Sequence, residues 1–518
     1  MKKALFTTIC CFIVFILPAQ QRWSNNYLES ENPFGKDLNE SYDKGYLFTG
    51  RFGPNYPNFN WLIKTDINGN LLWKKVLGEL NSYSSLADDI CLDNSGNIYL
   101  SGSTNFYGDD NSDPIIMKLN PCGEKVWCRV FIEEGNNYCS DVVLTPDKDV
   151  VVLLKYMNTI HISDRICLAK FDSSGNLLWN QCFNGSDSSV HNEEAREITL
   201  TPEGGFLLTG ECYYESPDPP HAWWIKPYYI KVDSAGNFEW EMVVHDEIID
   251  KGGAAWNTVL SSDRNYYYSS ISHYYHPPFG DAPALLKMDL NGSIIDIYDL
   301  APVGEYGKMV QAKFITDTTL MASATWGDGG GPEAVIIDTL GNIQYSLQLL
   351  DNEWMANTEV TFDKKLLFLT KIHDQNDNFS TYLFKLNQQL GSDTLYTQLF
   401  NYDSLCPNQI VSDTIPIEGC GLIVGMEELV DGNNNKIPEL LIYPSPAQNQ
   451  FTLQCEALNE SSTKAEIYDL YGQRVMSLEI PKGQTETTVK TEGWQKGVYL
   501  VQVWRAGGTL VSGKVVIE

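Results

Sequence analysis

The sequence predicts an all-β protein: a seven-bladed β-propeller followed by a small C-terminal β-sandwich. Three observations lead to this fold class. A hairpin-like segment, WLIKTDINGNLLWKKVLG at 61–78, returns along the chain, a second hairpin-like segment precedes each copy, and no stretch shows the 3.6-residue period of a helix. Four strands per period over seven periods give a propeller from about residue 33 to 400, with a solenoid or two β-sandwiches as the alternative.

The four strongest copies carry a Lys, an Asp or Asn, a Gly and a Trp at constant spacing, as in Lys64, Asp66, Gly69 and Trp73, and three weaker copies keep only part of this set. The Asp or Asn recurs at Asp66, Asn120, Asp172, Asp233, Asp289, Asp338 and Asn387. The steps are 54, 52, 61, 56, 49 and 49 residues, a spacing typical of propeller blades. The copies run in phase from innermost to outermost strand, so we expect the ring to close without a strand from the other terminus.

Length and charge narrow the function classes. With 518 residues, 43% of them hydrophobic and 12% aromatic, the chain can bury a large core and is expected to form two or more domains. The net charge of -31 disfavours nucleic acid and anionic membranes, because both require clustered Lys and Arg. We therefore expect no nucleic-acid partner.

The N-terminus has the pattern of a secretory signal peptide at residues 1–19. Two lysines precede an apolar run from Ala4 to Leu17, and the small residue Ala19 follows. Cys10 and Cys11 lie inside that run without a small residue before them, which argues against a lipoprotein. No other stretch is apolar enough to cross a bilayer, so no transmembrane span is predicted.

Export permits disulfides, and ten cysteines follow the signal peptide. Cys167 and Cys182 fall opposite each other on one predicted hairpin. Cys406 and Cys420 bracket a short polar segment that has no core of its own, which makes them the preferred bridge. Buried free thiols are the alternative for the isolated Cys91, Cys212 and Cys455.

The propeller repeat, an aliphatic strand followed by Lys-x-Asp-x-x-Gly-x-x-x-Trp, resembles the repeats of β-propeller proteins found among secreted bacterial products. This resemblance implies the fold and leaves the function open, because propellers occur as enzymes, lectins and scaffolds.

Residues 401–437 are expected to form a disulfide-containing connector and a linker that ends in the polar tract 431–436. A second domain follows at 438–518. Its alternating apolar residues and its size are typical of a small β-sandwich.

This second domain holds four motifs in order: YPSPA at 443–447, YDLYGQRV at 468–475, GVYLV at 497–501 and KVVI at 514–517. They resemble the type A C-terminal sorting domain of the type IX secretion system. The resemblance implies export to the extracellular space or the outer-membrane surface, with the translocon and its sorting peptidase as partners. The motif residues that carry it are Tyr443, Pro444, Pro446, Ala447, Gly472, Gly497, Tyr499 and Lys514.

No motif assigns catalysis, a metal or a cofactor. The Asp-x-Asn/Ser-Gly-Asn turn resembles the start of an EF-hand loop but lacks the Glu at its twelfth position. We therefore favour a tight hairpin with a left-handed Gly and an Asp or Asn bonded to its own backbone. His273 and His276, with His245 or His221, are too weak a set for a metal site.

Loop lengths differ between the two faces of the predicted ring. Turns within hairpins are short, whereas connections between hairpins and between blades are long and aromatic. Aromatic faces beside hydrogen-bonding groups are suited to a sugar or an extended peptide, although they also serve to pack loops together. The ligand-binding candidates are Tyr107, Tyr213, Tyr214, Trp223, Trp224, Tyr274, Tyr275 and Trp326.

Two functions follow. The first is a non-catalytic binding or interaction module for a glycan or protein ligand. The alternative is an extracellular polysaccharide-degrading hydrolase or lyase that uses acidic residues in the propeller pocket. The enzyme requires two carboxyl groups, or one with a His or Tyr, to converge there, and the many acidic residues single out no such pair.

Overall fold

The predicted hairpins form because apolar alternation is interrupted by short polar turns, and the computed structural model has a strand on each side of these turns except the last, at 387–391, which only β28 precedes. It describes residues 23–27, 33–52, 59–78, 84–105, 112–132, 135–157, 165–183, 190–215, 223–244, 251–275, 281–300, 307–326, 332–349, 353–373, 379–398, 400–424, 441–443, 447–454, 463–469, 474–481, 483–484, 486–505 and 508–517. Among these residues every regular element is a β-strand.

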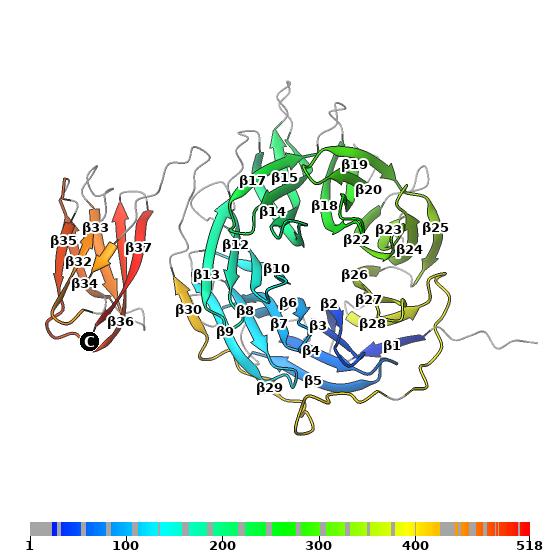
Figure 1. Ribbon diagram of the computed structural model, residues 1–518, viewed down its shortest axis with the longest axis horizontal. Coiled ribbons are helices and arrows are strands. Elements are labelled where there is room, and N and C mark those ends of the chain that lie inside the picture. The colour runs from blue at the N-terminus through cyan, green and yellow to red at the C-terminus, as the bar shows by residue number, and fades with distance from the viewer. Residues whose placement is uncertain are drawn as a thin grey trace, which may run out of the picture.

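The described strands from 23 to 424 form seven sheets arranged as blades around a ring (Figure 1). Blade 1 contains β2 (Phe34–Glu40), β3 (Tyr46–Phe52), β4 (Phe59–Thr65) and β5 (Leu71–Leu77). Blade 2 contains β6 (Ser84–Leu92), β7 (Ile98–Thr104), β8 (Asp113–Leu119) and β9 (Lys125–Ile132). Blade 3 contains β10 (Tyr138–Leu144), β11 (Val150–Tyr156), β12 (Arg165–Phe171) and β13 (Leu177–Phe183).

The next three blades repeat this order, with longer inner strands. Blade 4 contains β14 (Val190–Leu200), β15 (Phe206–Glu215), β16 (Trp223–Val232) and β17 (Phe238–Val243). Blade 5 contains β18 (Lys251–Leu260), β19 (Tyr266–Tyr275), β20 (Asp281–Asp289) and β21 (Ile294–Asp299). Blade 6 contains β22 (Gly307–Thr316), β23 (Thr319–Trp326), β24 (Pro332–Asp338) and β25 (Ile343–Gln348).

The ring closes with a strand from the N-terminus, so the expectation of closure without a borrowed strand was wrong. Blade 7 contains β26 (Glu353–Val360), β27 (Leu366–His373) and β28 (Phe379–Leu386), and its outer strand is β1 (Trp23–Tyr27), which pairs antiparallel with β28. The hydroxyl of Tyr27 donates to the carbonyl of Gly69 in blade 1 at 2.6 Å. The N-terminal strand therefore joins blade 7 to blade 1.

The repeated turns bond to themselves, as expected from their sequence. In the first copy, Oδ1 of Asp66 accepts hydrogen bonds from the amides of Asn68 and Asn70, both at 2.8 Å. Gly69 has a φ of 77°, the left-handed conformation that Gly adopts readily. Because backbone amides occupy the carboxylate, the turn is a structural hairpin.

In blades 2 to 6 the Gly of the turn also lies against an outer-strand aromatic residue of the preceding blade. A Cβ on Gly175 would lie 2.6 Å from the Trp127 ring, and one on Gly341 would lie 2.3 Å from Tyr298. The Gly and the aromatic residue of the repeat therefore act between blades, which explains why they recur together.

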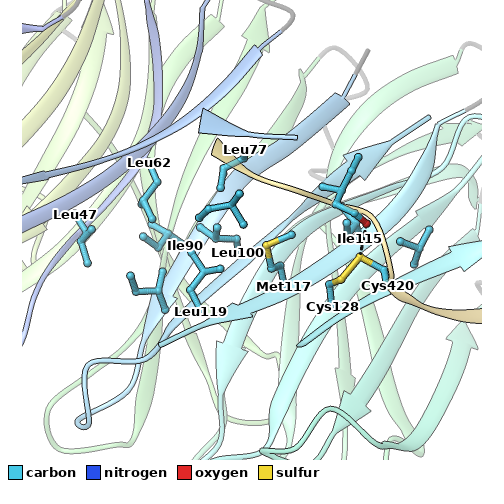
Figure 2. Packing of buried hydrophobic residues seen from close by; sticks show 14 of the residues in the cluster. Leu47, Leu62, Leu77, Ile90, Leu100, Ile115, Met117, Leu119, Cys128 and Cys420 are labelled. Atoms are coloured by element: carbon cyan, nitrogen blue, oxygen red, sulfur yellow. Dashed lines mark hydrogen bonds between the residues drawn. A yellow bond between two sulfur atoms is a disulfide. The ribbon is translucent and has the colours of Figure 1, made fainter. Parts of the chain in front are cut away.

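The hydrophobic core lies between neighbouring blades, where their sheet faces pack together. In one cluster, Leu47 and Leu62 of blade 1 pack with Ile90 and Leu100 of blade 2, all at most 3% exposed (Figure 2). Burial of this kind stabilises the protein by roughly 1.5–3 kcal/mol per large aliphatic side chain.

A segment at 400–424, here called the belt, runs outside blades 1 and 2 (Figure 1). It adds β29 (Thr414–Ile415) parallel to β5 and β30 (Gly421–Val424) parallel to β9. Ile415 and Ile417 are buried in the core between these two blades.

Disulfides attach the belt to blade 2, which corrects the expected bridge between Cys406 and Cys420. Cys406 is bonded to Cys122 with a Cα–Cα distance of 5.6 Å, and Cys420 to Cys128 at 4.8 Å (Figure 2). The segment has no core of its own, and it is stabilised instead by packing on the ring. Within blade 3, a disulfide joins the hairpin pair Cys167 and Cys182. Cys91 and Cys139 are free thiols, and Cys455 lies outside the described residues.

The C-terminal region is a β-sandwich of two sheets. The first sheet contains β31 (Leu441–Tyr443), β32 (Gln450–Gln454) and β35 (Glu486–Lys490). The second, here called the motif sheet, contains β33 (Thr463–Tyr468), β34 (Arg474–Ile480), β36 (Gly497–Arg505) and β37 (Gly508–Ile517). Phe451 from the first sheet shares a buried cluster with Ile467 and Val501 from the motif sheet.

Candidate functional site

The connections between hairpins and between blades leave the sheets at one end of the ring, here called the long-loop face. Apart from Tyr107, the ligand-binding candidates lie in strands that end at this face: Tyr213 and Tyr214 in β15, Trp223 and Trp224 in β16, Tyr274 and Tyr275 in β19, and Trp326 in β23. Tyr107 lies outside the described residues, and for Trp223, Tyr274, Tyr275 and Trp326 the structure describes the backbone alone. The predicted gathering of aromatic side chains there stays a prediction.

Blade 4 places three candidates in two cross-strand rows. Tyr214 lies opposite Trp224 and packs against the core between blades 3 and 4. Tyr213 lies opposite His191 and Ile225, and its side chain is 40% exposed. Of the described candidates, Tyr213 is therefore the side chain best placed to contact a ligand.

The structure reveals a second arrangement, which the sequence analysis missed. Each innermost strand carries an acidic or amide residue at or beside the same β-bulge, four or, in blade 6, five residues before the first turn of its blade. These residues, here called the axial ring, are Asp37, Asp89, Asp141, Glu197, Asn257, Gln311 and Asn357. A bulge turns a side chain out of its strand's regular alternation, which lets it reach the adjacent blade.

The axial ring connects successive blades by hydrogen bonds. Asp37 accepts from the amide of Ile90 and Asp89 from that of Val142, both at 3.0 Å. Asp141 accepts from the amide of Ile198 at 2.5 Å.

Amides make the same connection in later blades. Asn257 accepts from the backbone amide of Ala312, and Gln311 from that of Thr358, both at 2.8 Å. Glu197 instead accepts from the side-chain amide of Asn257 at 3.3 Å.

The carboxyl groups of the axial ring hold protons more tightly than usual. Burial raises the pKa of Asp89 well above its ordinary value, and Asp37 and Asp141, both hydrogen-bonded to it, raise that pKa further. Burial also raises the pKa of Asp37, and it raises that of Asp141 to about 6. Burial, together with the charge of Asp141, raises the pKa of Glu197. Asp89 is therefore the natural proton holder at the centre of this chain of carboxyls.

Lys313 supplies positive charge to the same region. Its Nζ lies 2.5 Å from Oε2 of Glu359 on β26, and the two side chains are 30% and 19% exposed. Burial lowers the pKa of Lys313, but Glu359, Asp37 and Glu197 outweigh burial and raise it. The proton-holding carboxyls of the axial ring therefore lie close to a charged ammonium group.

The sequence held a signal for this ring. In the first hairpin of each blade, an acidic or amide residue precedes an aliphatic residue, Ala or Thr at the start of the alternating run, as in Asp89-Ile90 and Glu197-Ile198. Aligning the first hairpins on their turns brings these residues into register.

Among the described side chains, no group of three or more His, Cys, Asp and Glu residues is arranged to hold a metal ion. Nor does the described part of the chain contain a helix that is both long and apolar enough to cross a membrane.

The structure separates the sorting-motif residues by environment. Ala447 and Tyr499 are buried in the sandwich core, whereas Tyr443 is 43% exposed. Gly497 begins β36, and Lys514 lies opposite Leu500 in the strand register. Pro444, Pro446 and Gly472 lie outside the described residues.

Comparison with known proteins identifies the C-terminal region. Residues 441–518 match the family described as secretion system C-terminal sorting domain. No curated protein matches the chain in sequence.

Solved structures resemble the chain only remotely. The periplasmic gluconolactonase of Pseudomonas aeruginosa is 13% identical with a TM-score of 0.39, over 64% of this chain and 93% of that one. A protein of unknown function from Dyadobacter fermentans is 10% identical with a TM-score of 0.43, over 59% and 96%. Prolyl oligopeptidase B from Galerina marginata is 10% identical with a TM-score of 0.44, over 84% and 57%. Similarity at this level says nothing about activity.

The family match and the sheets together define the chain in outline. A β-propeller precedes a C-terminal sorting domain of the type IX secretion system, and the protein is exported to the cell surface or the extracellular space.

Proposed function

We propose that the propeller is a non-catalytic binding module that contacts an extracellular glycan or protein through its long-loop face. One observation carries this proposal: the axial carboxyls are engaged in joining the blades. Asp37, Asp89 and Asp141 each accept a backbone amide of the next blade. A carboxyl held in this way is poorly placed to attack or protonate a substrate.

Blade 4 supports a binding role at the long-loop face. Its strands β15 and β16 have 10 residues each, against 7 for β3 and β4, and the extra residues extend the strands toward that end. Tyr213 offers an exposed aromatic ring there beside His191, a combination suited to a sugar face or a peptide side chain.

A hydrolase or lyase is the second candidate, favoured by the axial pKa values. Asp141, with a pKa of about 6, lies near Asp89, whose pKa is higher still. Carboxyl groups with separated pKa values are the usual acid and base of such enzymes.

A glycan array with the purified full-length chain, run beside an assay for released reducing ends, tests both candidates. We expect binding without release, and about a tenfold loss of affinity in Tyr213→Ala, as for an aromatic anchor. Tyr345→Ala is the matched control, because Tyr345 is 44% exposed but lies on outer strand β25 of blade 6. Release of reducing ends that is abolished by Asp141→Asn would establish the enzyme instead.

We also propose the division of the chain into a signal peptide at 1–19, a propeller at 33–400 to which β1, β29 and β30 add strands from outside these bounds, a connector at 401–437 and a sorting domain at 438–518. The translocon and its sorting peptidase are the proposed partners of the last region, on the basis of the family match.

A further inference from the structure

Three of the four sorting motifs meet in one row across the motif sheet. Arg474 lies opposite Tyr468, Tyr468 opposite Leu500, and Leu500 opposite Lys514. Arg474 and Tyr468 come from one motif segment, and Leu500 and Lys514 come from two others. Segments that are separated in the sequence are therefore adjacent in the sheet.

This row is not needed for the sandwich core. Side chains alternate between the faces of a strand, and the buried Ile467, Tyr499 and Val501 point into the core. Tyr468 and Leu500, which alternate with them, therefore belong to the opposite, outward face. Packing between the two sheets does not explain the residue types on that face.

Glu466 organises the outward face beside this row. Its carboxylate accepts from Lys464 Nζ at 2.6 Å, from the Tyr468 hydroxyl at 2.6 Å and from Arg474 Nη1 at 2.8 Å. The hydrogen bond from Lys464, followed by that from Tyr468, lowers the pKa of Glu466 to about 2. The side chains of Lys464 and Arg474 remain 49% and 56% exposed. One carboxylate thus holds two exposed cations in place, which reduces the ordering entropy lost on binding a partner.

Charge distinguishes this region from the rest of the chain. Residues 441–518 contain eight of the 67 acidic and seven of the 36 basic residues, so nearly the whole net charge of -31 precedes them. A partner surface rich in carboxylates would be repelled by the propeller and attracted to the two fixed cations. Such a surface would bind the sorting domain and would not bind the propeller.

We propose that the outward face of the motif sheet, centred on Glu466, is the surface that the secretion machinery recognises, and that it binds an acidic surface of that machinery.

The test uses the full-length chain in a cell that exports it. The double variant Lys464→Glu with Arg474→Glu reverses both cations. The control, Lys490→Glu with Lys496→Glu, makes the same charge change at two exposed positions outside the motif sheet. We expect about a tenfold fall in the surface and medium fractions for the first variant, with periplasmic accumulation, and normal export for the control.

Limited proteolysis of the periplasmic fraction checks that the sorting domain stays folded. If the reversal variant is degraded, the neutral pair Lys464→Gln with Arg474→Gln replaces it, with an expected fall of about threefold because attraction is lost without repulsion. Normal export of a folded variant overturns the proposal, as does an equal loss in the control.

An intramolecular contact is the remaining outcome. If small-angle scattering of the purified chain shows the sorting domain held against the acidic propeller, and released by the double variant, the face serves the chain itself and the proposal fails.

Discussion

Blades 1 to 4 and blades 5 to 7 place different chemistry at the same axial position. Blades 1 to 4 have a carboxyl group and blades 5 to 7 have an amide, yet Asp37 and Asn257 make equivalent bonds to the next blade. The bond between blades therefore needs an oxygen acceptor and does not need a charge. The carboxyls are buried groups that hold protons, and burying them costs free energy. The bonds between blades could be made without them.

The largest effect is expected where the acceptor is removed. Asp141→Ala should lower the free energy of unfolding by about 3 kcal/mol, because the buried amide of Ile198 loses its acceptor. Asp141→Asn keeps an oxygen for the Ile198 amide and loses the one that accepts from Val142, so it should cost about 1 kcal/mol, clearly less than Asp141→Ala. Urea titration of both variants measures the difference, and equal losses would mean that the charge matters after all.

An intermediate effect is expected where a carboxyl is added to the amide side. Asn257→Asp should cost about 2 kcal/mol, because Nδ2 of Asn257 donates to the Ala312 carbonyl and to Glu197, and a carboxylate cannot. Gln311→Glu is the matched control, since Oε1 of Gln311 accepts from Thr358 and a carboxylate keeps that bond. Thermal unfolding at pH 7 distinguishes the two. A Gln311→Glu loss as large as that of Asn257→Asp would refute the donor argument.

The smallest effect is expected from pH. The folded pKa values of Asp37, Asp89, Asp141 and Glu197 are raised, so the folded chain keeps protons that the unfolded chain releases above about pH 4. This contribution to stability is complete below that pH and is lost as pH rises through about 6 for Asp141 and through higher values for Asp89.

We expect the propeller to lose roughly 1–2 kcal/mol between pH 5 and pH 8 through these groups. Lys313, with its positive charge, limits the loss. Asp89→Asn replaces the proton holder by a permanently neutral group and should flatten the profile. Stability that rises over this range in the wild-type chain, or an unchanged slope in Asp89→Asn, would contradict the assignment.

The sequence was sufficient for the blades because their signals are local. An Asp, a Gly and a Trp within eight residues specify the turn and supply the aromatic ring that the turn of the next blade contacts. Each strong copy can therefore be recognised from a short stretch of sequence. The same reasoning predicted the turn chemistry that Asp66 and Gly69 show.

The closure of the ring between blades 7 and 1 could not be predicted from local sequence patterns. Tyr27 meets Gly69, and β1 pairs with β28 from the far end of the series. One signal was present: the seventh copy has Leu390 where the others have Gly, and Thr394 where the strongest copies have Trp. Cys406 and Cys420 were misassigned for a related reason, because proximity along the chain favours a short loop whereas their partners lie 284 and 292 residues away.

The axial ring was missed because its residues are polar, lie at bulges and differ in type between blades. A pattern search for one amino acid does not find a position that accepts Asp, Glu, Asn and Gln. The aromatic candidates at the long-loop face await the test of Tyr213, since side chains next to loops are set by tertiary packing that periodicity does not encode.

The Cys128–Cys420 bond determines how mechanical force enters the ring. Tension applied to the chain beyond Val424, on the sorting-domain side, reaches Cys420 and passes through sulfur into β9, bypassing the belt before Cys420. The hydrogen bonds of β29, which precedes Cys420, then carry none of that tension. Pulling on the chain from the sorting-domain side would load a covalent link in blade 2.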